Sequence, residues 1–140
     1  PNDENFMDYQ EIEAFIVSLM KDYKVKEVAY DPAFFERSAQ VLLDRGVPMV
    51  NFPQTHSRMI PACGNAYDLI ANTKVRHNGD PTFTDQVMSA AQRTTDMGWR
   101  LSKGRSKRKI DGAIAMVLML DRITAPEPLS DEPEVAIINL

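Results

Sequence analysis

Helical and extended patterns alternate along the first half of the chain, and this order is the strongest constraint on its fold. Apolar residues recur at helical spacing in three segments, 9–23, 34–45 and 57–72. Short apolar segments at 25–30 and 48–52 lie between them, and a proline follows each within two residues. Because helix and strand alternate, we predict an α/β fold in which the two strands pair in parallel.

The second half predicts more helix than strand. A helix is expected over 81–95, with Pro81 in its first turn, and another over 109–123. Segment 98–102 is expected to be extended, and 74–77 could form a short strand. The apolar run 113–120 fits a buried helix and is shorter than the ~18 residues that a membrane span needs.

Two strands alone do not make a stable sheet. Either further strands lie in segments interpreted as loops, or the first strands of the sheet lie upstream of Pro1. We favour the second interpretation, because the chain starts without Met and its first five residues are polar and acidic, unlike a signal peptide. We therefore expect a partial domain over 1–123 and a proline-containing tail over 124–140, in which 134–140 could add a strand.

Positive charge is concentrated in one segment of a chain whose net charge is −4. That balance excludes nucleic-acid binding over the whole surface. Ten residues nevertheless hold six cations, here called the basic strip. Its members are Arg100, Lys103, Arg105, Lys107, Arg108 and Lys109. The strip suits contact with phosphates better than base reading, and the alternative is a solvated loop.

Other chemistry-bearing side chains give weaker signals. Cys63 is the single cysteine, so it forms no internal disulfide, and a core position in a reducing cytoplasm is expected. His56 and His77 have no cysteine partner at zinc-site spacing. Both could line a cleft, as could Asp80, whose simpler role is to cap the helix at Pro81. Trp99 could stack on a base or lie in the core.

Neither a phosphate-binding loop of the Walker type nor a serine nucleophile elbow is present in the sequence. The chain therefore carries no ATPase motor of that kind.

Two aspartates are the candidates for metal binding. Asp31 follows the first expected strand, at the edge where open α/β sheets place ligand groups. Asp111 opens the last helix, directly after the basic strip. Each has a structural alternative, because Asp-Pro ends strands and an aspartate in a first turn caps amides. Cations that attract phosphate beside carboxylates that hold Mg²⁺ or Mn²⁺ are what phosphodiester hydrolysis needs.

Several motifs together resemble the nuclease domain of bacteriophage terminase large subunits. Val28-Ala29-Tyr30-Asp31-Pro32 and Lys109-Ile110-Asp111-Gly112-Ala113-Ile114-Ala115 are similar to the two late acidic motifs of that family. Segments 52–55 and 77–81 and the basic strip stand between them in the family's order. The resemblance covers roughly residues 8–123.

The resemblance implies an RNase H-like mixed sheet flanked by helices, with its N-terminal strands missing here. It also implies an endonuclease that cuts concatemeric genomic DNA by two-metal-ion hydrolysis in the host cytoplasm. Its partners would be double-stranded DNA, the portal protein and the small terminase subunit. The resemblance implies no association with a membrane. Asp31 matches the second and Asp111 the third of three acids, and no residue matches the first.

Two consequences and two alternatives follow. The isolated chain is expected to cleave weakly or not at all. The edge left by the missing first strand is expected to favour self-association or cover by 134–140. One alternative is a non-catalytic module that grips DNA or docks on the portal, which an ion pair between either acid and the basic strip would favour. The other is a transposase or junction resolvase of the same fold class.

Overall fold

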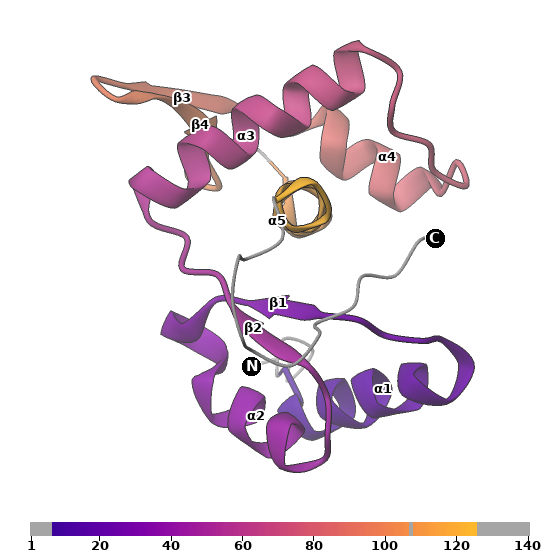
Figure 1. Cartoon of the computed structure of the whole chain (residues 1–140). Helices are drawn as coiled ribbons and strands as arrows, with labels where there is room; N and C mark the ends of the chain where they lie inside the picture. Colours follow the sequence, from indigo (N-terminus) through magenta and orange to yellow (C-terminus); the bar gives the residue numbers. More distant parts are fainter. Residues whose placement is uncertain (1–6, 107, 126–140) are drawn as a thin grey trace, which may run out of the picture. The chain divides into compact units, whose positions relative to one another are not determined.

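The computed structural model describes residues 7–106 and 108–125 of the chain, and they form two compact units. Among these residues, the N-terminal unit ends at Pro53 and the C-terminal unit begins at Gln54. Each unit has its own helices, its own pair of strands and its own buried side chains (Figure 1).

The N-terminal unit contains two helices and two parallel strands. Its elements are α1 (Tyr9–Asp22), β1 (Val28–Tyr30), α2 (Pro32–Asp44) and β2 (Met49–Asn51). β1 and β2 pair in parallel, with Ala29 opposite Val50. Both helices lie on one side of this two-stranded ribbon (Figure 1). The α/β class and the parallel pairing are therefore confirmed.

Local signals explain where these elements begin and end. Asp8 accepts a hydrogen bond from the Gln10 amide at 2.8 Å and so caps α1. Gly46 follows α2 with a φ of 81°, the left-handed conformation that ends many helices. The core of this unit consists of fully buried side chains, namely Ala39, Leu42, Val47 and Phe52.

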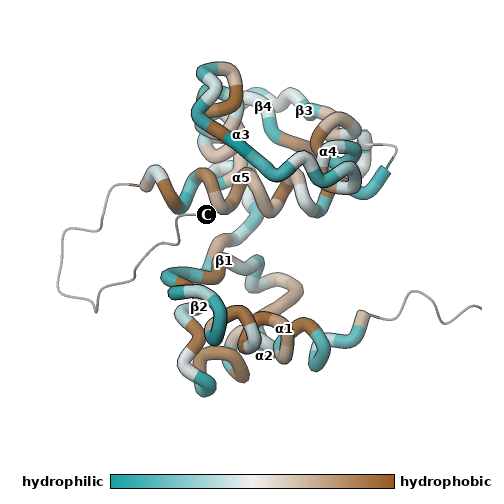
Figure 2. The backbone as a smooth tube through the Cα atoms, turned by 90° about the vertical axis from the view of Figure 1, so that its right-hand side faces the viewer, coloured by the Kyte–Doolittle hydropathy of each residue, from teal (hydrophilic) through white to brown (hydrophobic). Residues whose placement is uncertain are grey.

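The C-terminal unit is built around its last helix. Its elements are α3 (His56–Ala71), α4 (Pro81–Met88), β3 (Gln92–Thr95), β4 (Gly98–Leu101) and α5 (Asp111–Thr124). α5 packs against α3 and α4, and β4 packs against α3. Hydrophobic residues recur along α5 (Figure 2), and six of its residues are buried. A helix that is apolar on most sides lies in a core, so the predicted buried helix is confirmed.

The helix predicted over 81–95 is wrong in its second half. α4 ends at Met88, and 92–95 forms β3, which pairs antiparallel with β4. Thr94 and Thr95 are β-branched and favour the extended conformation. Gly98, at a φ of 130°, allows the chain to return after the turn.

No strand forms at 74–77, although this segment lies within the described residues. Each of the two sheets in the described structure has two strands, so β1 and β2 gain no third strand from a loop. The strand expected in 134–140, and with it most of the tail, lies outside the described residues. The boundary at 123/124 therefore stays a prediction. No described helix is long and apolar enough to cross a membrane.

Gly98 gives a direct test of how the hairpin sits on α3. A Cβ at this position would lie 2.8 Å from Ile60 Cγ2, and the backbone there is unfavourable for any other residue. We expect Gly98→Ala to lower the free energy of unfolding by about 1–3 kcal/mol, measured in urea. Gly104→Ala is the control, because the nearest atom to its added Cβ is 4.0 Å away. Equal losses for the two variants would contradict this packing.

Candidate functional site

Asp31 directly follows β1 and caps α2. Its Oδ1 accepts a hydrogen bond from the Ala33 amide at 3.1 Å, and Pro32 occupies the first position of the helix. β1 ends at Tyr30, directly before this pair, so the strand end expected for Asp31-Pro32 is confirmed. Only Oδ1 is engaged with the described part of the chain, and the residue is half-buried at the end of the strand.

Asp111 is the first residue of α5, but it does not cap the helix. The N-cap is Ile110, which offers no side-chain hydrogen bond. The amide of Gly112 is instead satisfied by Oε1 of Gln86, at 2.6 Å, from α4. The interpretation of Asp111 as an amide cap is therefore wrong. Its carboxylate is 62% exposed and forms an ion pair with Lys103.

The two acids belong to different units, Asp31 to the N-terminal one and Asp111 to the C-terminal one. Their roles as metal ligands stay predictions. Among the described residues no three His, Cys, Asp or Glu side chains come together as a metal-binding group.

The members of the basic strip have different surroundings. Arg108 pairs with Asp85 of α4 at 2.5 Å, and this hydrogen bond raises the pKa of the Arg108 guanidinium. Arg100 donates to the backbone carbonyl of Gln54 at 3.1 Å. Lys103 pairs with Asp111.

The remaining cations of the strip are less engaged. The exposed side chains of Arg105 and Lys109 form no ion pair within the described structure. Lys107 lies outside the described residues. Among the described residues of the strip, three cations are therefore without an ion pair: Arg100, Arg105 and Lys109.

The other three candidates have local structural roles. Asp80 caps α4 through a 2.6 Å hydrogen bond from the Phe83 amide, as expected. Nδ1 of His77 accepts from the Gly79 amide at 3.1 Å, and the His77 ring lies 5.6 Å from that of Phe83. His56 is the exposed first residue of α3. A shared cleft for these three stays a prediction.

Cys63 and Trp99 line an apolar cavity of about 280 Å³ between α3, the hairpin and α5. Trp99 is half-buried and meets the exposed Tyr67 edge to face at 6.2 Å, so it lies at the edge of the core rather than inside it. Burial raises the pKa of the Cys63 thiol, while the Leu101 amide and Arg100 act in the opposite direction. The thiol therefore stays protonated near neutral pH and is no nucleophile.

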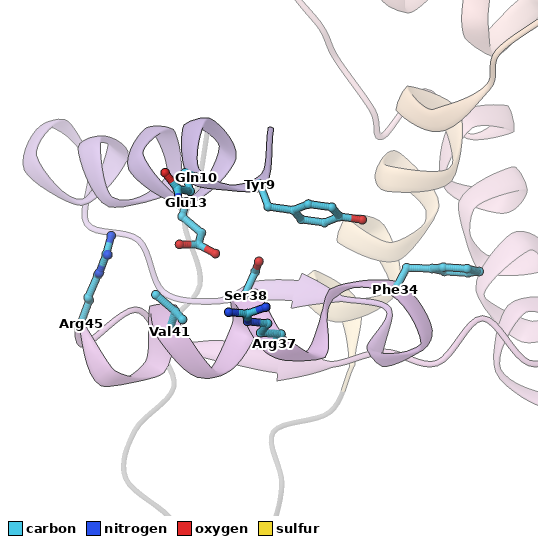
Figure 3. Close-up of a pocket in the computed structure, with 8 residues that line it drawn as sticks. All are labelled: Tyr9, Gln10, Glu13, Phe34, Arg37, Ser38, Val41 and Arg45. Atoms are coloured by element: carbon cyan, nitrogen blue, oxygen red, sulfur yellow. The ribbon is translucent and has the colours of Figure 1, made fainter. Parts of the chain in front are cut away.

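A groove of about 700 Å³ lies between α1 and α2 (Figure 3). Tyr9 and Phe34 stand at one end of it, and Glu13 reaches from α1 toward the Arg37 and Arg45 side of α2. Its charged groups are of both signs and do not select one kind of ligand. None of the predicted site residues lines it.

Arg93 was not among the residues predicted to contact DNA. Arg93 lies on β3, directly opposite Arg100 of β4, and so extends the surface of the basic strip. It was assigned to the helix predicted over 81–95. The two threonines that follow it, together with Gly98, were the signal for a hairpin.

Comparisons with known proteins agree with this fold. The model of the terminase large subunit endonuclease domain matches residues 2–127. The terminase large subunit of Enterobacteria phage HK97 is 28% identical over 116 residues, which are 80% of this chain and 23% of that protein. The crystal structure of the HK97 bacteriophage large terminase matches with a TM-score of 0.75 at 26% identity, over 83% of this chain and 25% of that one.

The chain thus spans about a quarter of the length of these two relatives. The structural match confirms the α/β fold of a terminase nuclease domain, with which the RNase H-like expectation is consistent. The transposase and resolvase alternative is not supported by these matches. Since the family model covers residues 2–127 of 140, the chain belongs to the endonuclease domain family of the terminase large subunit.

Proposed function

We propose that this chain is the metal-dependent DNA-cutting part of a longer packaging terminase, which hydrolyses phosphodiester bonds of concatemeric genomic DNA. The observation that carries the proposal is the state of Asp111. Its carboxylate is exposed and does not cap the helix, because Gln86 accepts the hydrogen bond of the Gly112 amide instead. It also lies two residues after Lys109 of the basic strip.

The candidate ligands fit a hard divalent cation in kind. Asp31 and Asp111 both offer carboxylate oxygens, which Mg²⁺ and Mn²⁺ prefer. Asp31 uses one oxygen for its cap, and Asp111 is engaged only by an exposed ion pair. They fit less well in number, because the family pattern has three acids and the sequence offers no match for the first.

In this proposal the chain's own residues hold and orient the reacting groups. Asp31 and Asp111 would hold the cations, and Arg105 and Lys109 would attract the DNA backbone toward them. A pair of such cations, when bound, offsets charge on the attacking and leaving oxygens. The contacts from the strip go to phosphates, so they position the duplex without reading its sequence.

The same proposal covers the setting of the longer protein. We propose double-stranded DNA as the substrate and the portal protein and small terminase subunit as partners, in the cytoplasm of the host cell. This assignment is supported by membership of the terminase family and by the similarity to the HK97 terminase large subunit, a protein about four times as long.

A second candidate function is a non-catalytic module that grips DNA or docks on the portal. The ion pair between Lys103 and Asp111 favours it, because this contact gives the acid a partner other than a metal. In that case Asp111 would be a structural residue of the strip, and divalent cations would not bind to it.

The first test removes the acids one at a time in the longer protein. We expect Asp31→Asn and Asp111→Asn each to lower Mn²⁺-dependent cleavage of plasmid DNA by about 100-fold or more, because even groups that merely orient metal ligands contribute 10–100-fold. Asp68→Asn, an exposed acid on α3, is the matched control and should cleave normally.

The isolated 140-residue chain is expected to cleave near background in the same assay, since two carboxylates hold metal ions more weakly than three. Robust cleavage by the chain that Asp111→Ala abolishes would contradict the expected weakness. Normal cleavage by Asp111→Asn in the longer protein would sink the proposed role of this acid.

The second test separates the two candidate functions through Lys103. Its ammonium group competes with a cation for Asp111, and both side chains are more than half exposed. We therefore expect Lys103→Met to tighten Mn²⁺ binding about two- to fivefold, the range of an exposed ion pair. Arg105→Met serves as the control for lost charge. Titration followed by electron paramagnetic resonance measures the affinity, and no binding in any variant would favour the module.

A third expectation concerns the sheet. Within the described residues β1 pairs only with β2, so its other edge has no strand beside it. We propose that this edge promotes self-association of the isolated chain, because open strand edges pair with other chains. Sedimentation equilibrium should then show dimers that increase with concentration. A monomer over the whole accessible range would contradict this expectation.

A further inference from the structure

Two arginines face each other across the β3–β4 hairpin. Arg93 and Arg100 are register partners in this antiparallel pair. Side chains directly opposite each other in such a pair point to the same face, with Cβ atoms about 4.5–5.5 Å apart, and like charges there are destabilising. The hairpin thus holds an unfavourable pair of positive charges.

The neighbouring residues of β4 face the other way. Trp99 and Leu101 line the apolar cavity with residues of α3 and α5. Because successive side chains of a strand alternate between faces, the arginine face of the hairpin is the one turned away from this cavity.

The arginine pair is fixed in place but not neutralised. The Arg100 guanidinium donates to the carbonyl oxygens of Gln54 at 3.1 Å and Leu101 at 3.3 Å. Both acceptors are neutral, so they orient the group without cancelling its charge. Arg93 is exposed, and its side chain makes no hydrogen bond or ion pair with the part of the chain that the structure describes.

No described carboxylate compensates the two charges. The ion pairs of the described residues join Arg58 to Asp121, Lys103 to Asp111 and Arg108 to Asp85. Asp96 is the acid in the turn of the hairpin, and it pairs with neither arginine. Arg58, Lys103 and Arg108 of this unit have acidic partners, whereas Arg93 and Arg100 are paired with each other across the hairpin.

The turn of the hairpin is held by its own hydrogen bonds. Thr95 Oγ1 donates to the carbonyl of Gly98 at 2.9 Å and accepts from the Met97 amide at 3.3 Å. The two strands therefore present the arginines on an ordered platform, and little ordering is needed when a ligand binds.

We infer that Arg93 and Arg100 form a phosphate-binding site on this hairpin. The guanidinium fork matches phosphate oxygens. An anion between two guanidinium groups attracts both of them and so offsets their mutual repulsion. The ligand is either a phosphodiester of the DNA backbone or a free phosphate. This inference deepens the proposed function, on which DNA as the source of the phosphate rests: it adds Arg93, which lies outside the basic strip, to the residues that contact the DNA backbone.

The test compares Arg93→Gln with Arg76→Gln in the full chain. Arg76 is also exposed and also without a partner in the described structure, so both variants lose one charge. Binding to a fluorescent duplex is measured by anisotropy, in EDTA and over a series of salt concentrations. We expect Arg93→Gln to weaken binding roughly tenfold and to lower the salt slope by about one, whereas Arg76→Gln changes neither. Arg93→Lys should bind with intermediate affinity.

Thermal unfolding is the second measurement of this test. Without phosphate, Arg93→Gln should melt at or above the temperature of the unmodified chain, because it relieves repulsion. Added inorganic phosphate, at constant ionic strength, should raise the melting temperature of the unmodified chain more than that of the variant. A phosphate response without a DNA response would support the site with free phosphate as its ligand.

Two outcomes would overturn the inference. One is an equal loss of duplex binding in the Arg93 and Arg76 variants, which would mean a general charge effect. The other is an unchanged response of Arg93→Gln to both ligands. Because EDTA removes divalent cations, the binding measurement does not depend on cleavage, and the unfolding measurement contains no DNA. Cleavage by Asp111→Asn in the longer protein, measured separately with Mn²⁺ and without EDTA, shows whether the proposed metal site fails independently.

Discussion

The burial of α5 determines where Asp111 lies and how its carboxylate is used. Ile110, Ala113 and Val117 are almost fully buried, so the first turn of the helix is fixed against the rest of the C-terminal unit. Gly112 allows α4 to approach this turn, because a Cβ there would lie 3.0 Å from Oε1 of Gln86 and 3.3 Å from the Phe83 ring. Gln86 then satisfies the helix amide that an aspartate would otherwise cap. The carboxylate of Asp111 is thereby left exposed at the positive end of the helix dipole, where an anion is favoured.

Sequence reasoning succeeded where the signal is local. Asp80 caps α4 as predicted, and β1 ends at Tyr30, directly before the Asp31-Pro32 pair that predicts a strand end; both signals lie within three positions along the chain. The apolar run of α5 was likewise sufficient to predict a buried helix, because its burial follows from composition. The parallel pairing of β1 and β2 followed from the alternation of helix and strand.

It failed where the signal comes from another part of the fold. Gln86 acts on a helix amide 26 residues along the chain, and Asp85 pairs with Arg108 at a separation of 23. Neither contact has a sequence pattern, because both depend on how α4 packs against α5. The end of α4 was also misplaced: Pro81 marks a helix start clearly, whereas no glycine or proline marks its end before Gly98. The two acids belong to separate units, so the metal ion that they are predicted to share stays a prediction.

The ion pair between Lys103 and Asp111 is only a weak competitor for a metal ion at Asp111. Both side chains are more than half exposed, at 59% and 62%, so water screens their attraction and the net stabilisation of such a pair is small. A divalent cation carries twice the charge of the ammonium group and binds the carboxylate oxygen directly, so it competes with Lys103 on favourable terms. A buried Lys–Asp pair would oppose metal binding more strongly, because separating the two side chains would leave an unpaired charge away from water. In the proposed nuclease, Lys103 would leave Asp111 for a phosphate of the DNA backbone, and Asp111 would then be available to a metal ion.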